Sequence, residues 1–205
     1  MTKLKVLIEG YARTEGDIEH ASSSTTLIQA NGLNIVVDPG MDRSLLIEKL
    51  KAESLVPADI NFVALSHTHL DHCMLAGMFE NAKIVDGDSV YSFDGTIVAH
   101  DGKIPGTDIE VIATPGHDQF HCSFIVNVEE FGKVAVAGDI FWFRSDDKQT
   151  SDTASLVSRE DPYVKNEKQL TESRKAILKL ADYIVPGHGK MFKVSKSTTQ
   201  DSPVW

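Results

Sequence analysis

Short apolar runs separated by turn residues fill the first part of the chain. Two runs rich in Val, Ile, Leu and Thr cover residues 3–9 and 25–37. The second run is interrupted by Asn31-Gly32, a pair that readily adopts positive φ in a tight turn. The pattern therefore predicts a strand over residues 3–9 and a β-hairpin over residues 25–37.

After residue 40 the apolar spacing becomes helical. Leu45, Leu46 and Leu50 fall on one helical face, and Pro57 lies beyond the end of this pattern. A short apolar run over residues 62–66 follows, which predicts the next strand.

The second half of the chain repeats short apolar runs divided by Asp-Gly, Pro-Gly and Phe-Gly pairs. The predicted strands cover residues 83–85, 96–100, 109–114, 122–128, 133–137 and 183–185. Several are apolar on both faces, so we expect them inside a layered structure. Leu170, Ile177, Leu178 and Ala181 share one face of a predicted helix, and Asn166 is placed to cap its beginning.

Composition points to an ordinary globular protein. The 205 residues are 41% hydrophobic and 24% charged, which suits a single domain over residues 1–205. No apolar run approaches the roughly 20 residues of a membrane helix, and the first apolar run is too short for a signal peptide. We therefore expect a cytoplasmic protein without membrane contact.

Charge and cysteine content narrow the function further. Twenty Lys and Arg against 30 Asp and Glu give a net charge of −10, which disfavours non-specific binding of nucleic acid. Cys73 and Cys122 form no Cys-x-x-Cys pair, so we expect two small buried side chains in a reducing compartment.

Histidine and aspartate are concentrated in one hexapeptide, His67-Thr-His69-Leu-Asp71-His72, directly after a predicted strand. Alternate residues of an extended chain share a face, so His67 and His69 project to one side. A turn then directs Asp71 and His72 towards a point next to the one that His67 and His69 face. Two adjacent metal ions could share this segment.

Three further candidate ligands each follow an apolar strand and a Gly: His117, Asp139 and His188. Together these seven nitrogen and oxygen ligands suit borderline divalent ions, zinc first, with iron or manganese as alternatives. His121 either orients a ligand from behind or begins a strand. His20 and His100 are expected on the surface or in loops.

These motifs resemble those of the metallo-β-lactamase-fold superfamily. The resemblance rests on His-Thr-His-Leu-Asp-His, Thr-Pro-Gly-His, Ala-Gly-Asp and Pro-Gly-His-Gly in this order, with Val37-Asp38-Pro39-Gly40 upstream. Within the superfamily, Glu9-Gly10-Tyr11, Ser158-Arg-Glu-Asp-Pro162 and Ser173-Arg-Lys resemble the branch of metallo-β-lactamase-domain-containing protein 1.

The resemblance implies an α/β fold, a four-layer αββα sandwich with a two-metal site at one edge. It assigns His67, His69 and His117 to metal one, Asp71, His72 and His188 to metal two, and Asp139 to a bridge between them. Two such ions lower the pKa of a shared water towards ~7, which predicts a hydroxide nucleophile. Asp71 and Asp139 are the expected catalytic residues, with Asp71 also a proton acceptor.

The implied reaction is hydrolysis of an ester-type bond: a phosphodiester, a thioester or a carboxylic ester. Persulfide dioxygenases use the same scaffold, with one iron held by residues that match His67, His117 and Asp139. A catalytically silent binding module is a third alternative. Some relatives in the branch are nucleic-acid phosphodiesterases, a role that the acidic charge balance does not favour here.

Residues 141–164 have little periodicity and begin just after Asp139, which predicts a specificity segment or lid. Trp142 and its two Phe neighbours either line an apolar wall or pack in the core. Arg144 either contacts an anionic substrate or pairs with Asp146 or Asp147 on the surface. Residues 11–21 are expected to form a second mobile rim. We expect a small-molecule substrate and leave association into a homodimer open.

Overall fold

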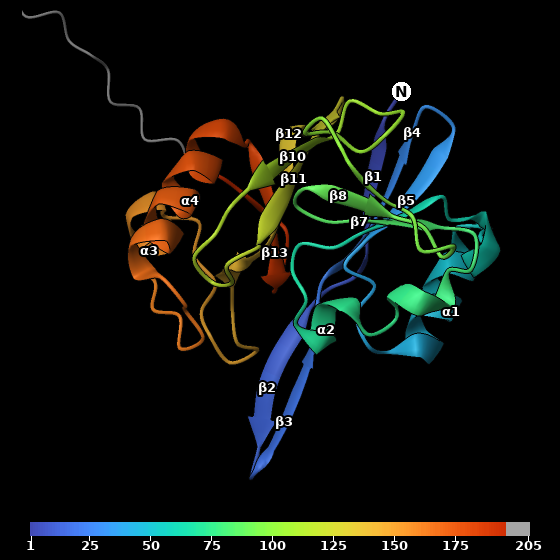
Figure 1. Cartoon of the computed structure of the whole chain (residues 1–205). Helices are drawn as coiled ribbons and strands as arrows, with labels where there is room; N and C mark the ends of the chain where they lie inside the picture. Colours follow the sequence, from blue (N-terminus) through green and yellow to red (C-terminus); the bar gives the residue numbers. More distant parts are fainter. Residues whose placement is uncertain (196–205) are drawn as a thin grey trace, which may run out of the picture.

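The computed structural model describes residues 1–195, so residues 196–205 of the predicted single domain lie outside the described part. Two β-sheets pack face to face, and helices lie on both sides of the pair (Figure 1). In sheet order, the larger sheet contains β1 (Lys3–Ile8), β4 (Thr25–Ala30), β5 (Leu33–Val37), β6 (Phe62–Ala64), β7 (Lys83–Val85), β8 (Ser89–Tyr91) and β9 (Ile97–Ala99). The smaller contains β10 (Glu110–Ala113), β11 (Cys122–Val128), β12 (Gly132–Trp142), β13 (Tyr183–His188) and β14 (Phe192–Lys193).

The core between the sheets follows from the two-residue period of the strands. Ile35 and Val37 of β5 point into it, as do Phe124 and Val126 of β11. Val36, between the first two, faces outwards. Because both faces of these strands are covered, their sequences are mainly apolar.

Helices cover the two outer faces of the sheets. The helix α1 (Arg43–Ala52) buries Leu46 and Leu50 against the larger sheet. On the other side, α3 (Thr153–Ser158) and α4 (Glu167–Leu180) bury their apolar faces against the smaller sheet. The four-layer αββα architecture is therefore confirmed.

The helix ends agree with the sequence patterns. The side chain of Asn166 accepts a hydrogen bond from the backbone N–H of Gln169, as expected for the residue that caps α4. Asp42 caps α1 in the same way. The short helix α2 (Leu70–Cys73) and two 3-10 turns, Pro57–Asp59 and Ala76–Met78, complete the helical elements of residues 1–195. Among residues 1–195, no helix has the length and apolar character needed to cross a membrane.

Residues 11–21, which were expected to form a second mobile rim, lie in a regular β-hairpin. Its strands β2 (Tyr11–Glu15) and β3 (Ile18–Ser22) pair with each other and project from the body of the molecule (Figure 1). The hairpin was not predicted because its polar residues lie on both faces and give no alternation.

The segment 141–164 is likewise more ordered than its sequence predicts. Phe141 and Phe143 are buried in the core beneath α3 and α4, so core packing is the correct interpretation for these two side chains. Trp142, which lies between them on β12, points to the opposite face. The strands β8 and β14 and the helix α3 were missed because each is too short to show a period.

Candidate metal centre

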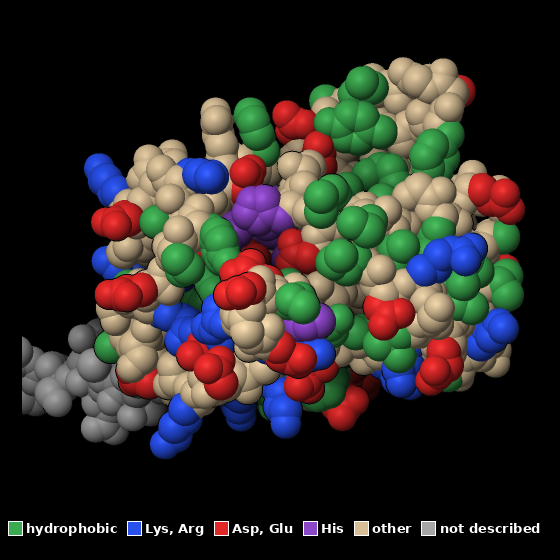
Figure 2. All heavy atoms as spheres, turned by 90° about the horizontal axis from the view of Figure 1, so that it is seen from below, with side chains coloured by type: hydrophobic (Ala, Val, Ile, Leu, Met, Phe, Trp, Pro, Cys, Tyr) green, Lys and Arg blue, Asp and Glu red, His purple; other side chains and the backbone are tan. Residues whose placement is uncertain are grey.

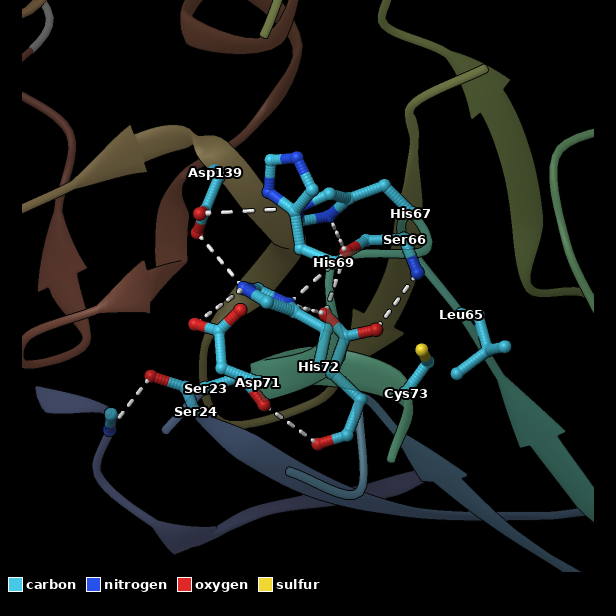
Figure 3. A network of polar contacts seen from close by, with 12 residues as sticks. Ser23, Ser24, Leu65, Ser66, His67, His69, Asp71, His72, Cys73 and Asp139 are labelled. Carbon is cyan, nitrogen blue, oxygen red and sulfur yellow. Dashed lines mark hydrogen bonds and ion pairs between the residues drawn. The ribbon is translucent and has the colours of Figure 1, made fainter. Parts of the chain in front are cut away.

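The predicted hexapeptide lies at one end of the larger sheet. The strand β6 ends at Ala64, and the chain continues through Ser66 into the helix α2 (Leu70–Cys73). His67 and His72 are buried and His69 is half-buried. Figure 3 shows that these side chains and that of Asp71 converge on one point.

The other three candidate ligands come from the smaller sheet. His117 lies in the loop between β10 and β11, Asp139 is within β12, and His188 ends β13. The strands β12 and β13 are parallel neighbours, which places Asp139 and His188 at the same edge of the sheet. All seven side chains predicted from the sequence are therefore brought together.

The carboxylate of Asp139 lies between two groups of histidines. Its Oδ2 is 3.5 Å from His117 Nε2 and 3.9 Å from His67 Nε2. Its Oδ1 is 3.2 Å from His72 Nε2 and 3.6 Å from His188 Nε2. Each oxygen therefore faces a different set of nitrogens.

The ligand atoms divide into two groups on geometry. The first contains His67, His69, His117 and Asp139; the second contains Asp71, His72 and His188. Within each group the ligand atoms lie within 4.8 Å of one another. Each group offers three or four nitrogen and oxygen donors, a set that Zn²⁺ and other borderline divalent ions accept.

Unpartnered buried atoms show that these residues fit metal ions. His67 Nε2, His72 Nε2 and Asp139 Oδ1 are buried and have no hydrogen-bond partner among the described residues. Buried polar atoms are rarely left in this state. In addition, His117 Nε2 and His69 Nδ1 face each other at 3.2 Å, a distance at which two ring lone pairs repel unless a proton or cation lies between them. Bound cations would therefore provide the partners that these buried nitrogen and oxygen atoms lack in the protein alone.

The outer ring nitrogens of three histidines are held by oxygen acceptors. His72 Nδ1 donates to Asp38 Oδ2 at 2.9 Å, and His188 Nδ1 donates to the Tyr11 carbonyl at 3.0 Å. His117 Nδ1 donates to Asp161 Oδ2 at 2.6 Å. These bonds direct each Nε2 into the cluster.

Sequence reasoning missed Asp38 and Asp161 as orienting groups. Both belong to segments used for the resemblance, but neither lies near its histidine in the chain. Asp38 follows β5 and has a positive φ of 46°. Its Oδ1 accepts the backbone N–H of Ser66, and its Oδ2 accepts the Ser66 hydroxyl as well as His72 Nδ1–H. An aspartate directly after a buried strand was the available signal for this residue.

His121 lies behind the cluster, as one of the two sequence interpretations proposed. Its Nε2 accepts the backbone N–H of Asp139 at 3.1 Å, so its proton is on Nδ1, which donates to Thr114 Oγ1. The pKa of His121 is lowered to about 3, chiefly by burial and secondly by the neighbouring His117. His121 is therefore a neutral support for the backbone that carries Asp139.

Burial and neighbouring charges shift the pKa values of His72 and Asp139 in opposite directions. Burial alone lowers the pKa of His72 and raises that of Asp139, but mutual attraction reverses both shifts. The pKa of His72 is held well above its ordinary value by Asp139 and Asp38, and that of Asp139 well below by His72 and His188. Asp139 is therefore ionised at neutral pH.

A cleft of about 820 Å³ opens over the cluster. Figure 2 shows histidine side chains at the floor of a hollow, with acidic groups around them and hydrophobic side chains along one side. The β2–β3 hairpin, the start of α1, Trp142, Arg144 and Tyr163 line its walls. Any substrate that reaches the cluster must contact these groups.

Arg144 lies at the wall of the cleft and pairs with a neighbouring carboxylate, whereas its contact with an anionic substrate stays a prediction. Its Nη2 donates to Thr14 Oγ1 at 2.6 Å, which connects the hairpin to the end of β12. Its Nε lies 3.6 Å from Asp146 Oδ1. Asp147 accepts the backbone N–H of Arg144 and pairs with the guanidinium of Arg159. The guanidinium is thus tethered at the cleft wall and partly exposed there.

Three other sequence expectations need revision or refinement. Cys122 is buried as expected, but Cys73 is only half-buried because it lies on the outer side of the short helix α2. His20 is partly exposed and lines the cleft. His100 is partly buried, since its ring bonds to the Asp86 carbonyl and the Gly102 N–H.

Comparison with known proteins agrees with this fold and this site. Residues 20–94 match the family model described as the metallo-beta-lactamase superfamily. The chain is 38% identical to metallo-beta-lactamase domain-containing protein 1 of Xenopus laevis over 201 residues, covering 93% of this chain and 81% of that protein.

Two solved structures share the architecture. A protein from Thermotoga maritima assigned to the metallo-beta-lactamases has a TM-score of 0.72 at 21% identity, covering 94% of this chain and 99% of that one. AidC, a dizinc quorum-quenching lactonase in complex with a product, has a TM-score of 0.59 at 17% identity, covering 88% and 78%.

The layered fold and the convergent His/Asp cluster define a metal-binding protein of the αββα type. The chain belongs to the metallo-beta-lactamase superfamily. Family membership and the cluster together support metal-dependent hydrolase chemistry in general.

Proposed function

We propose that this chain is a dinuclear metal-dependent hydrolase that cleaves an ester-type bond, whether a phosphodiester, a thioester or a carboxylic ester. The observation that carries the proposal is the position of Asp139, whose two oxygens face two different groups of histidines. Under this proposal His67, His69 and His117 would hold one ion, Asp71, His72 and His188 would hold the other, and Asp139 would contribute to both. Zn²⁺ is the ion that best suits this donor set, with iron or manganese as alternatives.

When bound, a pair of divalent ions supplies a hydroxide at neutral pH and polarises the bond to be cleaved. The chain's own residues orient the ligand histidines and exclude water from one side of the cluster. Asp38, Asp161 and the Tyr11 carbonyl keep the ligand histidines in one tautomer. The buried aromatic and apolar groups behind β12 keep water from that side of the cluster.

Asp71 is the carboxylate placed to accept a proton. Its side chain is 22% exposed, against 7% for Asp139, so it is the more accessible of the two carboxylates that line the cleft. Its Oδ2 lies 3.2 Å from His188 Nε2, which holds this oxygen in place. The other oxygen is left to accept a proton from the reacting groups.

The first prediction concerns metal content. Because two donor groups are present, metal-replete protein should bind about two ions per chain. Removal of the ions with a chelator should abolish hydrolysis, and readdition of Zn²⁺ should restore it. Elemental analysis alongside a panel of esters, thioesters, lactones and phosphodiesters gives the measurement. A persistent content near one iron, with oxygen consumption on persulfides, would replace this proposal with the oxygenase alternative.

The second prediction concerns Arg144. If its guanidinium contacts an anionic substrate, Arg144→Ala should raise KM for carboxylates or phosphodiesters by a factor that corresponds to roughly 1.5–3 kcal/mol, and spare neutral esters. Arg144→Lys should recover only part of this, because an ammonium lacks the bidentate geometry. Steady-state kinetics on one anionic and one neutral substrate measures the effect.

Thr14→Val provides the matched control, since it removes the tether of Arg144 without removing its charge. A smaller rise in KM for the anionic substrate is expected in this variant. Equal effects of Arg144→Ala on both substrates would show that the residue acts on the shape of the cleft and not on substrate charge.

A further inference from the structure

Two sequence motifs, Ser158-Arg-Glu-Asp-Pro162 and Ser173-Arg-Lys, meet at one buried guanidinium, which the proposed chemistry does not use. Arg174 lies on α4 and is only 2% exposed. Its hydrogen bonds run to backbone carbonyls: Nε donates to Ile140, and Nη1 donates to Val157 and Arg159. Its Nη2 is buried without a hydrogen-bond partner among the described residues.

The three carbonyls belong to two elements next to the candidate metal centre. Ile140 directly follows Asp139 on β12. Val157 and Arg159 lie at the end of α3, where carbonyl groups have no partner within the helix. Arg174 therefore joins α4, the end of α3 and the strand that carries Asp139.

The chain that leaves α3 reaches Asp161 two residues after Arg159. Asp161 accepts the Nδ1–H of His117 through Oδ2, and the backbone N–H of Tyr163 at 3.0 Å through Oδ1. It belongs to neither helix, so its position depends on how the segment between α3 and α4 is held. The backbone bonds from Arg174 hold the beginning of that segment.

We propose that Arg174 is a positioning residue of the metal centre, which fixes the backbone carrying Asp161 and thereby orients His117. The proposal rests on the metal centre proposed above. An apolar side chain of similar size would fill the same space without the cost of burying a charge. Burial lowers the pKa of Arg174 to about 10, so the guanidinium stays charged at neutral pH and its donors stay complete.

The experiment measures Co²⁺ binding to the full chain with Arg174→Met, by calorimetry and by the visible absorption of the bound ion. We expect an affinity about tenfold weaker than wild type, the lower end of the range for loss of a group that orients a ligand. The absorption spectrum should also change, because the angle of the His117 ring to the ion changes.

Leu178→Ala is the matched control for stability. Leu178 lies on the same helix and is buried against the same sheet, but its apolar side chain forms no hydrogen bond to the segment around Asp161. This variant should unfold at lower denaturant concentration, with unchanged Co²⁺ affinity and spectrum. Equal losses of affinity in the two variants at matched stability would overturn the proposal.

A double-mutant cycle with Asp161→Asn tests the route of the effect. If Arg174 acts through Asp161, Arg174→Met should cause no further loss of affinity in the Asp161→Asn background. An undiminished tenfold loss there would overturn the proposal. If Arg174→Met does not fold, Arg174→Lys replaces it, with a smaller loss that Asp161→Asn again removes.

The controls separate this inference from the proposed function. Wild-type protein that binds no Co²⁺ would overturn both. Wild-type binding with an unchanged Arg174→Met variant would overturn only the role of Arg174.

Discussion

Asp139→Asn is expected to lower hydrolysis more than ~100-fold, because loss of a group that merely orients a ligand already costs about 10–100-fold. The substitution keeps the shape of the side chain but removes the negative charge between two groups of histidines. Metal content should fall below that of wild type, while the secondary structure is retained, since the core between the sheets does not include Asp139. Turnover, elemental analysis and circular dichroism on the same sample give the three readouts.

Asp108→Asn is the matched control for the loss of one charge. Asp108 is an exposed carboxylate that pairs with Lys103 at 3.1 Å, an arrangement worth little in free energy. Metal content and turnover should equal those of wild type. Full metal content and full turnover in Asp139→Asn itself would remove Asp139 from the site and with it the bridged two-metal proposal.

The convergence of the seven candidate ligands could be predicted because each carries a local signal. His67 and His69 alternate at the end of an apolar run, and His117, Asp139 and His188 each follow a Gly that comes after an apolar run. Such positions lie at the edge of a sheet whatever the detailed topology. The layered core could be predicted for the same reason, since runs apolar on both faces require cover on both sides.

The groups that orient the ligands could not be predicted, because their partners are distant in the chain. Asp161 lies 44 residues from His117, and Asp38 lies 34 residues from His72. Only the packing of α4 on the smaller sheet brings the segment with Asp161 behind the His117 ring. Composition does not indicate which of the acidic residues orient the ligand histidines.

Three consecutive aromatic residues illustrate a different limit. Phe141, Trp142 and Phe143 look equivalent in sequence, but alternate residues of β12 face opposite sides. The register of β12 against β13 places Trp142 beside His188, with 6.1 Å between ring centroids, and both Phe side chains under the helices. That register includes irregularities between Val136 and Trp142, which no pattern of apolar residues reveals.

Close packing of β13 against β12 leads to the second large effect. Gly187 directly precedes His188, and a Cβ added to it would lie closer to Asp139 Oδ1 and to the Gly138 backbone than the 3.0 Å that real Cβ atoms keep. The carbonyl of Gly187 also accepts the backbone N–H of Ser24 at 2.6 Å, so this part of β13 is held from the other side. The missing side chain is therefore what allows the Asp139 carboxylate to lie where it does.

Gly187→Ala is expected to displace the Asp139 carboxylate and to lower metal content and turnover about as much as Asp139→Asn does. It should also lower the free energy of unfolding by about 1–3 kcal/mol, the usual cost of overpacking, because backbone as well as side-chain atoms must move. Gly77→Ala is the control, since a Cβ at Gly77 meets nothing within 4 Å, and it should leave all three quantities unchanged. Elemental analysis, turnover and urea unfolding measure them. Wild-type metal content in Gly187→Ala would show that β13 yields to the methyl group without moving Asp139, and that the close approach does not position the carboxylate.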